Sequence, residues 1–469
     1  MNHKKLLLTL TLCLCALLCM VVTASASEVS VHTNHFSCGV VGCQNNDHGH
    51  TQVTEWQPWT GPQSASKDNI PYDSNTKTAY IYLANNVEIE DALTIPRGHT
   101  LYLCLNGHDI IRTGNLIQIQ EDASFTLCDC KGDKAEYGKL DSNKGGRVVS
   151  FESGKPGTFT MYGGIITGGN ITGNSGGVFV GDKNTFTMYG GTITGNRARY
   201  TGGGVVVYGA FNMYGGAITG NSAQEGGGGV AAHGTFTMYG GAITDNTCNG
   251  SYNGGGVYVK NGTWSTGAIT LSGNVQIKDN YKGSNSNKKP SNIYLDRNKT
   301  ITVAGPLTGS SIGVTTAAEP GTGSNVTFAN SSTNTIATGI FTPDTAGVLV
   351  GVAADGTSAY LYKCSHVYKW AYDEEYHWKK CTNVGCDSVE AGSKIAHTWD
   401  YPATYTAPKT CVCGATQGEP LTRSYYYYTP SAAENKKDSP KTADPGVLLY
   451  AGLALASLAG LACTAKKRH

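Results

Sequence analysis

A phrase that occurs four times in the middle of the chain limits what this sequence can fold into. Its copies, of which FTMYGGTITGN is one, begin at Phe159, Phe186, Phe211 and Phe236, and therefore lie 27, 25 and 25 residues apart. Repeats of this length are typical of stacked units, because a single unit cannot bury its own apolar face. We therefore expect a solenoid.

The pattern within each copy indicates β-strands. Phe and Met take every second position, Thr (or Asn) and Tyr take the positions between, and a Gly-Gly break follows. A short apolar run, such as GGVFV at 176–180, precedes each copy of the phrase. Three short strands in about 25 residues suit one coil of a parallel β-helix, whereas a propeller blade needs about 40 residues. Weaker copies beginning at Leu101, Phe125, Ile269 and Ile301 extend the predicted stack to at least eight coils.

Equivalent positions of successive coils should form columns with a spacing of about 4.8 Å. One inward column is predicted to contain Leu103, Leu127, Met161, Met188, Met213, Met238, Leu271 and Val303. A corner position repeats asparagine, and we interpret it as a hydrogen-bonded side-chain ladder rather than a binding site. The predicted members of this ladder are Asn174, Asn196, Asn221, Asn246 and Asn280.

The N-terminus has the features of a secretory signal peptide. Lys4 and Lys5 precede an apolar run at 6–22, and Ala24-Ser25-Ala26 follows as a small-residue cleavage site. We expect residues 1–26 to be removed and the protein to be exported.

The C-terminus carries a pentapeptide, an apolar run and a basic tail, in that order. The pentapeptide is Ser439-Pro440-Lys441-Thr442-Ala443, and the apolar run occupies 447–463. This order resembles the cell-wall sorting signal of Gram-positive surface proteins, although that signal usually has Leu at the first position and Gly at the fifth. The resemblance implies cleavage by a sortase and attachment to peptidoglycan. The alternative is a retained transmembrane helix, since 17 residues would just cross a membrane.

Processing at both ends changes the charge and the cysteine count. Five basic residues and one acidic residue are lost, so the net charge moves from +1 to about −3, and no basic patch suggests nucleic acid. Eleven of the 15 cysteines remain, an odd number that rules out complete intramolecular pairing. Cys104 and Cys128 occupy equivalent outward positions of adjacent coils and could form a disulfide, with Cys130 as a nearby rival.

Two Cys/His-rich segments flank the repeats, and they look like copies of one small module. They share the spacing C-x4-C, and each is followed by His and then Trp. Thiolate and imidazole suit tetrahedral zinc, whereas a disulfide within each C-x4-C is the alternative outside the cell. No carboxylate base lies beside either cluster, so we do not expect a catalytic metal. The candidate ligands are His35, Cys38, Cys43, His48 and His50 in the first module, and Cys364, His366, Cys381, Cys386, His397, Cys411 and Cys413 in the second.

These features divide the chain into six parts. They are a signal peptide at 1–26, the first Cys/His module at 27–60, a β-helix with its caps at 61–362, the second module at 363–417, a linker at 418–438 and the sorting signal at 439–469. The lead-in module, the coils, the trailing module and SPKTA together resemble gut-bacterial wall-anchored proteins with a right-handed β-helix of the pectin-lyase-like superfamily. The resemblance implies an all-β solenoid with a C-terminal hydrophobic helix. Because that superfamily includes lyases, glycoside hydrolases, adhesins and stalks, it does not settle the activity.

The core coils offer little that suits acid–base catalysis. The outward residues of the first strand are Phe179, Val206, Ala231 and Tyr258, none of which suits proton transfer. Asp245 and Asp279 occupy equivalent corners and are weak catalytic candidates, but Asp-Asn at a corner is usually turn chemistry.

An outward column of tyrosines is the better candidate for binding. Aromatic faces flanked by hydroxyl groups could contact host or dietary glycans, although stacked tyrosines could simply stabilise the coils. The column contains Tyr162, Tyr189, Tyr214 and Tyr239. We therefore expect adhesion or glycan binding, and the alternative is a carbohydrate-active enzyme of the same fold.

Overall fold

The computed structural model describes residues 55–422, apart from short gaps at 63–68, 132–135, 251–253, 263–265, 285–286, 322–323, 334–335, 384–385 and 387. The predicted signal peptide, the Cys and His residues of the first module, the sorting pentapeptide and the hydrophobic segment 447–463 lie outside the described residues. The described chain divides into two compact units, which are residues 55–371 with 377–395, and residues 372–376 with 396–422.

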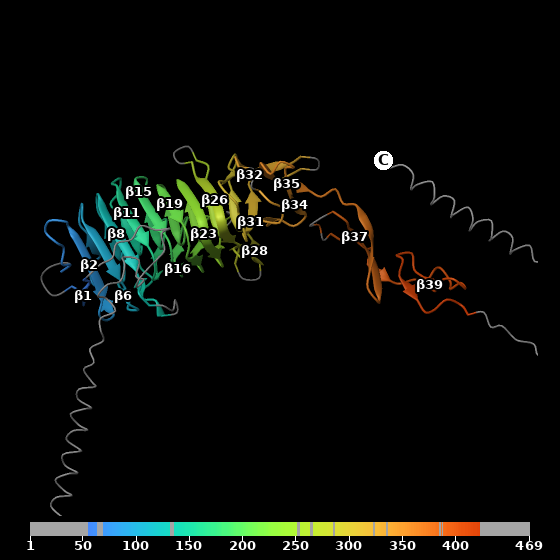
Figure 1. Ribbon diagram of the computed structural model, residues 1–469, viewed down its shortest axis with the longest axis horizontal. Coiled ribbons are helices and arrows are strands. Elements are labelled where there is room, and N and C mark those ends of the chain that lie inside the picture. Colours follow the sequence, from blue (N-terminus) through green and yellow to red (C-terminus); the bar gives the residue numbers. More distant parts are fainter. Residues whose placement is uncertain are drawn as a thin grey trace, which may run out of the picture. The chain divides into compact units, whose positions relative to one another are not determined.

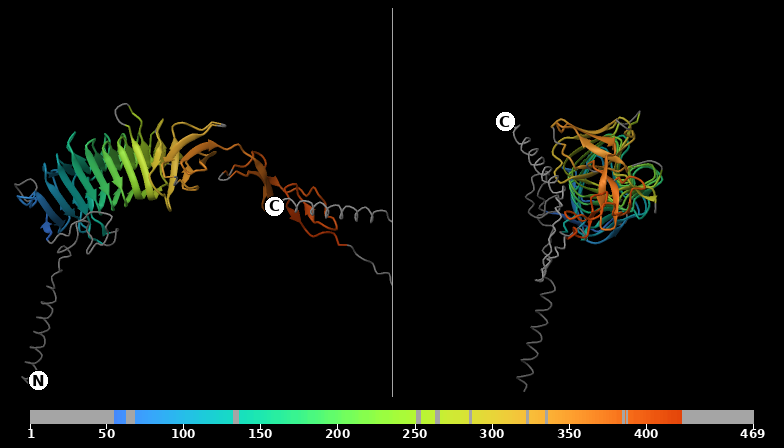
Figure 2. Two further views of the ribbon diagram at one scale, coloured as in Figure 1. Left: turned by 45° about the horizontal axis from the view of Figure 1, so that its top comes forward. Right: turned by 90° about the vertical axis from the view of Figure 1, so that its right-hand side faces the viewer.

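The first unit is built mainly from three stacks of parallel strands, as expected for coils of a parallel β-helix (Figures 1 and 2). The first stack contains β1 Gln57–Trp59, β2 Thr78–Leu83, β5 Thr100–Cys104, β8 Ala123–Cys128, β11 Gly157–Met161, β15 Asn184–Met188, β19 Ala210–Met213, β23 Thr235–Thr244, β26 Ala268–Ile277 and β30 Ile301–Val303. The second contains β4 Leu93–Ile95, β7 Ile117–Ile119, β10 Val149–Phe151, β14 Val178–Val180, β18 Val205–Val207, β22 Val230–Ala232, β25 Val257–Val259, β29 Ile293–Leu295 and β31 Ser311–Thr316.

The third stack completes the coils. It contains β3 Val87–Glu88, β6 Ile110–Ile111, β9 Lys139–Asp141, β12 Ile165–Thr167, β16 Thr192–Thr194 and β20 Ala217–Thr219, and it continues through the second halves of β23 and β26. Two-residue strands form a small separate sheet beside the coils. They are β13 Asn170–Ile171, β17 Arg197–Ala198, β21 Ser222–Ala223, β24 Thr247–Cys248, β27 Tyr281–Lys282 and β28 Lys289–Pro290.

The inward column that the repeats predict is confirmed residue by residue. Met161 pairs with Leu127 and with Met188, and the register continues without a slip through Met213, Met238 and Leu271 to Val303. Every member is fully buried. The phenylalanines two residues earlier stack with ring centroids 4.6–5.2 Å apart, so they fill the core beside the methionines.

The asparagine ladder exists, but its membership differs from the prediction. The Asn196 side chain donates to Asn221 Oδ1 at 3.0 Å, and Asn221 donates to Asn246 in the same way. The chain of bonds continues through the predicted member Asn280 to two residues that the repeats do not mark, Asn292 and the Asp344 carboxylate. We refer to Asn196, Asn221, Asn246, Asn280, Asn292 and Asp344 as the asparagine ladder.

Asn174 is not part of this ladder, which corrects the prediction. The equivalent position of its coil is Gly169, whose N–H donates to Asn196 Oδ1. A Cβ at Gly169 would meet the Gly176 carbonyl oxygen at 1.9 Å, so no side chain fits there. Asn174 instead accepts from Thr201 and lies near the Tyr208 hydroxyl.

The two ends of the stack differ from its middle. At the start, β1 pairs with β2, so residues 57–59, which the sequence assigned to the first Cys/His module, are part of the sheet. At the other end the pairing becomes antiparallel where β35 meets β32 and β34, as suits an exit cap. The strands here are β32 Val326–Ser331, β33 Phe341–Pro343, β34 Val348–Val352 and β35 Ser358–Lys363.

Short strands follow the exit cap. They are β36 Tyr368–Tyr372, β37 Tyr376–Cys381 and β38 Ile395–Ala396, which form a three-stranded sheet, and the antiparallel pair β39 Lys409–Thr410 and β40 Thr416–Gln417. Among the described residues, no helix has the length and apolar character needed to cross a membrane.

Candidate functional site

The four tyrosines lie in one row on the outside of the coils. Each follows an inward methionine, which ends the strand in β11, β15 and β19 and lies within the longer β23, and the alternation of side chains turns the tyrosine outward. Neighbouring ring centroids are 5.0, 4.9 and 4.6 Å apart, with interplanar angles of 8°, 17° and 11°. Tyr214 and Tyr239 are 42% and 41% exposed. We call Tyr162, Tyr189, Tyr214 and Tyr239 the tyrosine ladder.

The orientation of the rings changes how this ladder could bind. The sequence suggested a line of aromatic faces turned to solvent, but each ring stacks against its neighbours. Tyr214, which has a ring on both sides, therefore exposes its edge and its hydroxyl rather than its face. Burial raises the pKa of Tyr189 and Tyr214, so their hydroxyls stay protonated at neutral pH and can donate as well as accept.

The weak catalytic candidates Asp245 and Asp279 behave as turn residues. Both have left-handed backbones, with φ of 58° and 56°, and both are exposed. Gly195 and Gly220 occupy the same corner of the preceding coils with φ of 67° and 66°. Because the corner requires this conformation, which Asp tolerates better than most residues, the turn explains both aspartates without a catalytic role.

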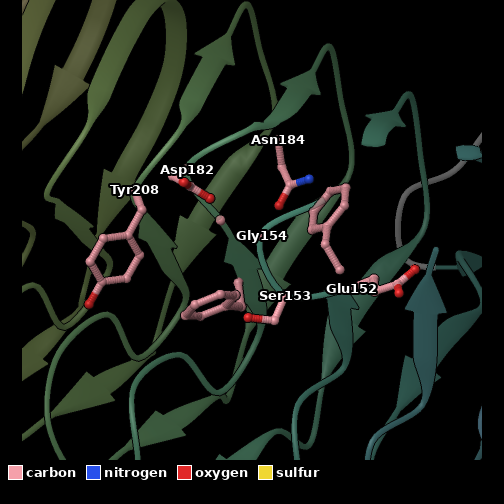
Figure 3. A pocket seen from close by; sticks show the side chains of 9 residues that line it. Glu152, Ser153, Gly154, Asp182, Asn184 and Tyr208 are labelled. Carbon is pink, nitrogen blue, oxygen red and sulfur yellow. The ribbon is translucent and has the colours of Figure 1, made fainter. Parts of the chain in front are cut away.

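A pocket that the sequence did not reveal opens at the corner between the second and first strand stacks. Figure 3 shows its lining, and its volume is about 290 Å³. Apolar rings line much of it, and Ser153, Asp182 and Asn184 add polar groups. We call it the corner pocket. Its residues come from three coils outside the repeated phrase, and the only signal for it is that Phe179 and Tyr208 are large aromatic residues beside glycine-rich turns.

The corner pocket does not present two carboxylates to a substrate. Glu152 lines it, but its carboxylate accepts from Arg97 at 2.6 Å and from the N–H of Glu121 at 3.1 Å. Arg97 is the largest cause of the lowered pKa of Glu152, so this group stays ionised. In Figure 3 the Glu152 side chain points away from Asp182. Glycoside hydrolysis requires a pair of carboxyl groups across the substrate, and this arrangement does not supply it.

The outward face of the second strand stack is largely closed. Val206 and Ala231 point outward by alternation but are fully buried, and a Cβ at Gly202 would meet Val206 Cγ2 at 2.2 Å. His233 stacks on Tyr208 with ring centroids 4.7 Å apart, and its Nε2 lies 3.3 Å from Thr201 Oγ1. Burial, with a smaller effect of Lys260, lowers the pKa of His233 to about 4. His233 is therefore neutral at physiological pH.

Cys104 and Cys128 are register partners, as the coil spacing predicts. Both are fully buried, because they pack with Trp56 on the outside of the coils. Burial is the largest cause of the raised pKa of Cys104, so this thiol is a poor nucleophile. A disulfide between Cys104 and Cys128 stays a prediction.

The second Cys/His module brings four of its candidate ligands together within the first unit. The donor atoms of Cys364, His366, Cys381 and Cys386 all lie within 4.8 Å of one another, so the group could hold a metal ion. The Sγ atoms of Cys364 and Cys381 are 3.6 Å apart. Cys386 Sγ lies 3.4 Å from His366 Nδ1. We call these four residues the CHCC cluster.

Three further candidates gather within the second unit. The donor atoms of His397, Cys411 and Cys413 also lie within 4.8 Å of one another, and Cys413 Sγ is 3.5 Å from His397 Nδ1. His397 Nε2 lies 2.9 Å from the Asp373 carbonyl oxygen. A bond from Nε2–H to this carbonyl leaves Nδ1 as the nitrogen available for a metal.

No protein-family model, curated protein or solved structure matches this chain.

Proposed function

We propose that this chain is a secreted surface protein, anchored to the cell wall, whose right-handed parallel β-helix of the pectin-lyase-like type presents the tyrosine ladder for adhesion to glycans. The signal peptide and the resemblance of SPKTA to a sorting signal support export, with a sortase and peptidoglycan as partners. A mature net charge of about −3 gives no reason to expect nucleic acid.

The observation that carries the proposal is the regularly spaced tyrosine ladder, whose members Tyr214 and Tyr239 are exposed and whose other two members are half-buried. Its ring centroids repeat every 4.6–5.0 Å along the coils, so the hydroxyls of the stacked rings form a row beside the side chains of Thr160, Thr187, Asn212 and Thr237. The rings hold one another in place, so little conformational freedom is lost when a ligand binds. A polysaccharide, which repeats its own hydroxyl groups, is the class of ligand that such a row of donors and acceptors suits.

Two double variants test which part of the tyrosines binds. Tyr189→Phe with Tyr214→Phe removes two hydroxyls and keeps the ring stack, so each lost hydrogen bond should cost about 0.5–1.5 kcal/mol. Binding to a glycan identified on an array should weaken about tenfold or more. The matched variant Tyr189→Ala with Tyr214→Ala should bind the glycan no more tightly than the Phe variant does. If the Phe variant binds as the parent does, hydroxyl contacts are not the basis of binding; if the parent binds no glycan, the adhesion proposal fails.

A carbohydrate-active enzyme of this fold is the second candidate, and the corner pocket is the observation that favours it. Aromatic rings with one exposed carboxylate, Asp182, could accommodate the end of a sugar chain. The ion pair that holds Glu152 counts against it. Release of reducing ends from polysaccharides by the parent, and its loss in Asp182→Asn, would favour the enzyme.

Within this proposal the second Cys/His module carries structural zinc. Cysteine thiolates with imidazole form the donor set that zinc prefers among common metals. When bound to the CHCC cluster, the ion would supply folding free energy rather than chemistry, because four protein ligands complete a tetrahedral shell.

A further inference from the structure

Two separations within the CHCC cluster match those of a tetrahedral zinc site. Zinc lies about 2.3 Å from sulfur and about 2.0–2.1 Å from nitrogen, so ligand atoms at tetrahedral corners are roughly 3.4–3.8 Å apart. The S–S separation of Cys364 and Cys381 is 3.6 Å. The S–N separation of Cys386 and His366 is 3.4 Å. Both agree with edges of one tetrahedron.

Neighbouring groups hold these ligands in position. Asn383 donates from Nδ2 to Cys364 Sγ at 3.0 Å and lies 2.9 Å from the Ser365 carbonyl oxygen. The His366 ring stacks on Tyr368 with centroids 5.4 Å apart. Such outer contacts orient metal ligands and stabilise thiolate charge. Four protein ligands fill a tetrahedral shell, so the site would be closed and structural.

The cluster lies on the outer face of the exit cap. In β34, Val348 packs into the β-helix core, and Leu349 therefore points to the opposite face. Leu349 is nevertheless only 6% exposed, because it packs with Cys381 and Cys386. Its register partner in β35, Tyr362, packs on the same cluster. The ligands thus cover the side of the cap that would otherwise meet solvent.

The zinc ligands also lie next to the strands of the exit cap along the chain. Cys364 immediately follows Lys363, the last residue of β35, whereas Cys381 ends β37 and Cys386 follows it. We propose that zinc held by Cys364, His366, Cys381 and Cys386 clamps residues 377–383 and Cys386 onto β34 and β35, and so closes the C-terminal end of the β-helix. This inference rests on the zinc proposed above. Zinc binding and ordering of the exit cap are then one coupled event.

The full mature chain, prepared with zinc, is compared with Cys381→Ser. A matched control is Cys248→Ser, since Cys248 is also buried but lies in the small side sheet, where its thiol contacts the Gln224 carbonyl oxygen. Zinc content is measured by elemental analysis, and cobalt(II) substitution reports thiolate ligands in a tetrahedral site. Amide hydrogen exchange over 348–363 reports the exit cap.

We expect Cys381→Ser to lose one equivalent of zinc and the matching cobalt(II) absorption, and the amides of β34 and β35 to exchange at least tenfold faster. Exchange in the middle coils, such as β15 and β19, should stay unchanged. In Cys248→Ser, the zinc content, the cobalt(II) absorption and the exchange over 348–363 should all equal those of the parent. Leu349→Ser should speed exchange in β34 while zinc is retained. A parent without zinc would overturn both the zinc proposal and the clamp. Loss of zinc with unchanged exchange in β34 and β35 would overturn the clamp alone.

Discussion

His233 is a titratable side chain that the coils hold in one protonation state. It is 5% exposed and lies between the Tyr208 ring and Thr201. Its pKa of about 4 in the folded protein is below the ordinary value of 6.5, so folding favours the neutral ring. The stability that this preference contributes is complete above about pH 6.5 and is lost as the pH falls towards 4.

We therefore predict that the free energy of unfolding decreases by at most about 3 kcal/mol through His233 between pH 6.5 and pH 4. His233→Gln keeps a polar side chain near Thr201 but does not titrate. Denaturant unfolding of both proteins across this range isolates the effect of His233 from that of other groups. Parallel stability curves for the two proteins would show that His233 is not the cause.

Single residues also show what the sequence could and could not predict. The inward position of Met213 follows from period-two alternation, and the structure confirms it. Asn174 was misassigned because it ends the tetrapeptide ITGN at 171–174, as Asn196 does at 193–196, whereas the register places Gly169, which has no room for a side chain, at the ladder position. The stacking of the tyrosine rings depends on side-chain rotamers, which alternation does not determine.

At the scale of elements, the asparagine ladder joins consecutive coils at one corner. Asn221 donates to Asn246 Oδ1 and to the Ile193 carbonyl oxygen, and it accepts from Asn196. The bonds between ladder members all run from an asparagine amide to the next member towards the C-terminal end, where Asp344 accepts from Asn292 through both carboxylate oxygens. An ionised carboxylate has no N–H or O–H group that could donate to a further residue, so the ladder ends where the coils end. Asn292 and Asp344 lie outside any repeat, which is why the sequence did not indicate them.

We predict that Asn221→Ala lowers the free energy of unfolding by about 3 kcal/mol, because it leaves buried polar groups of two neighbouring coils without partners. Asn212→Thr is the matched control, since other coils carry Thr at that half-buried position. It should change stability by less than about 0.5 kcal/mol. Thermal or denaturant unfolding measures both. Equal stability of Asn221→Ala and the parent would mean that the ladder contributes little.

On the scale of the molecule, the β-helix coils contact mainly their neighbours along one axis, so stability should be a sum over coils and their interfaces. The register makes one coil removable. Ala210 pairs with Thr235, and Phe211 pairs with Phe236. Deleting residues 211–235 therefore joins Ala210 to Phe236 and keeps every inward and outward position, including a ladder that passes from Asn196 to Asn246.

We predict that this deletion folds cooperatively, with β-type circular dichroism and a denaturant m-value lower by about a tenth, since m follows the surface exposed on unfolding. Deleting residues 211–222 is the control. It removes about half a coil and joins Ala210, in a strand of the first stack, directly to Ala223, in the small side sheet. The chain after this junction is therefore out of register with the coils before it, and the core and corner columns no longer align. That protein should lose cooperative unfolding, because misaligned coils bury polar corners and expose apolar side chains. If both deletions unfold alike, the stability of this chain does not depend on the register of its columns.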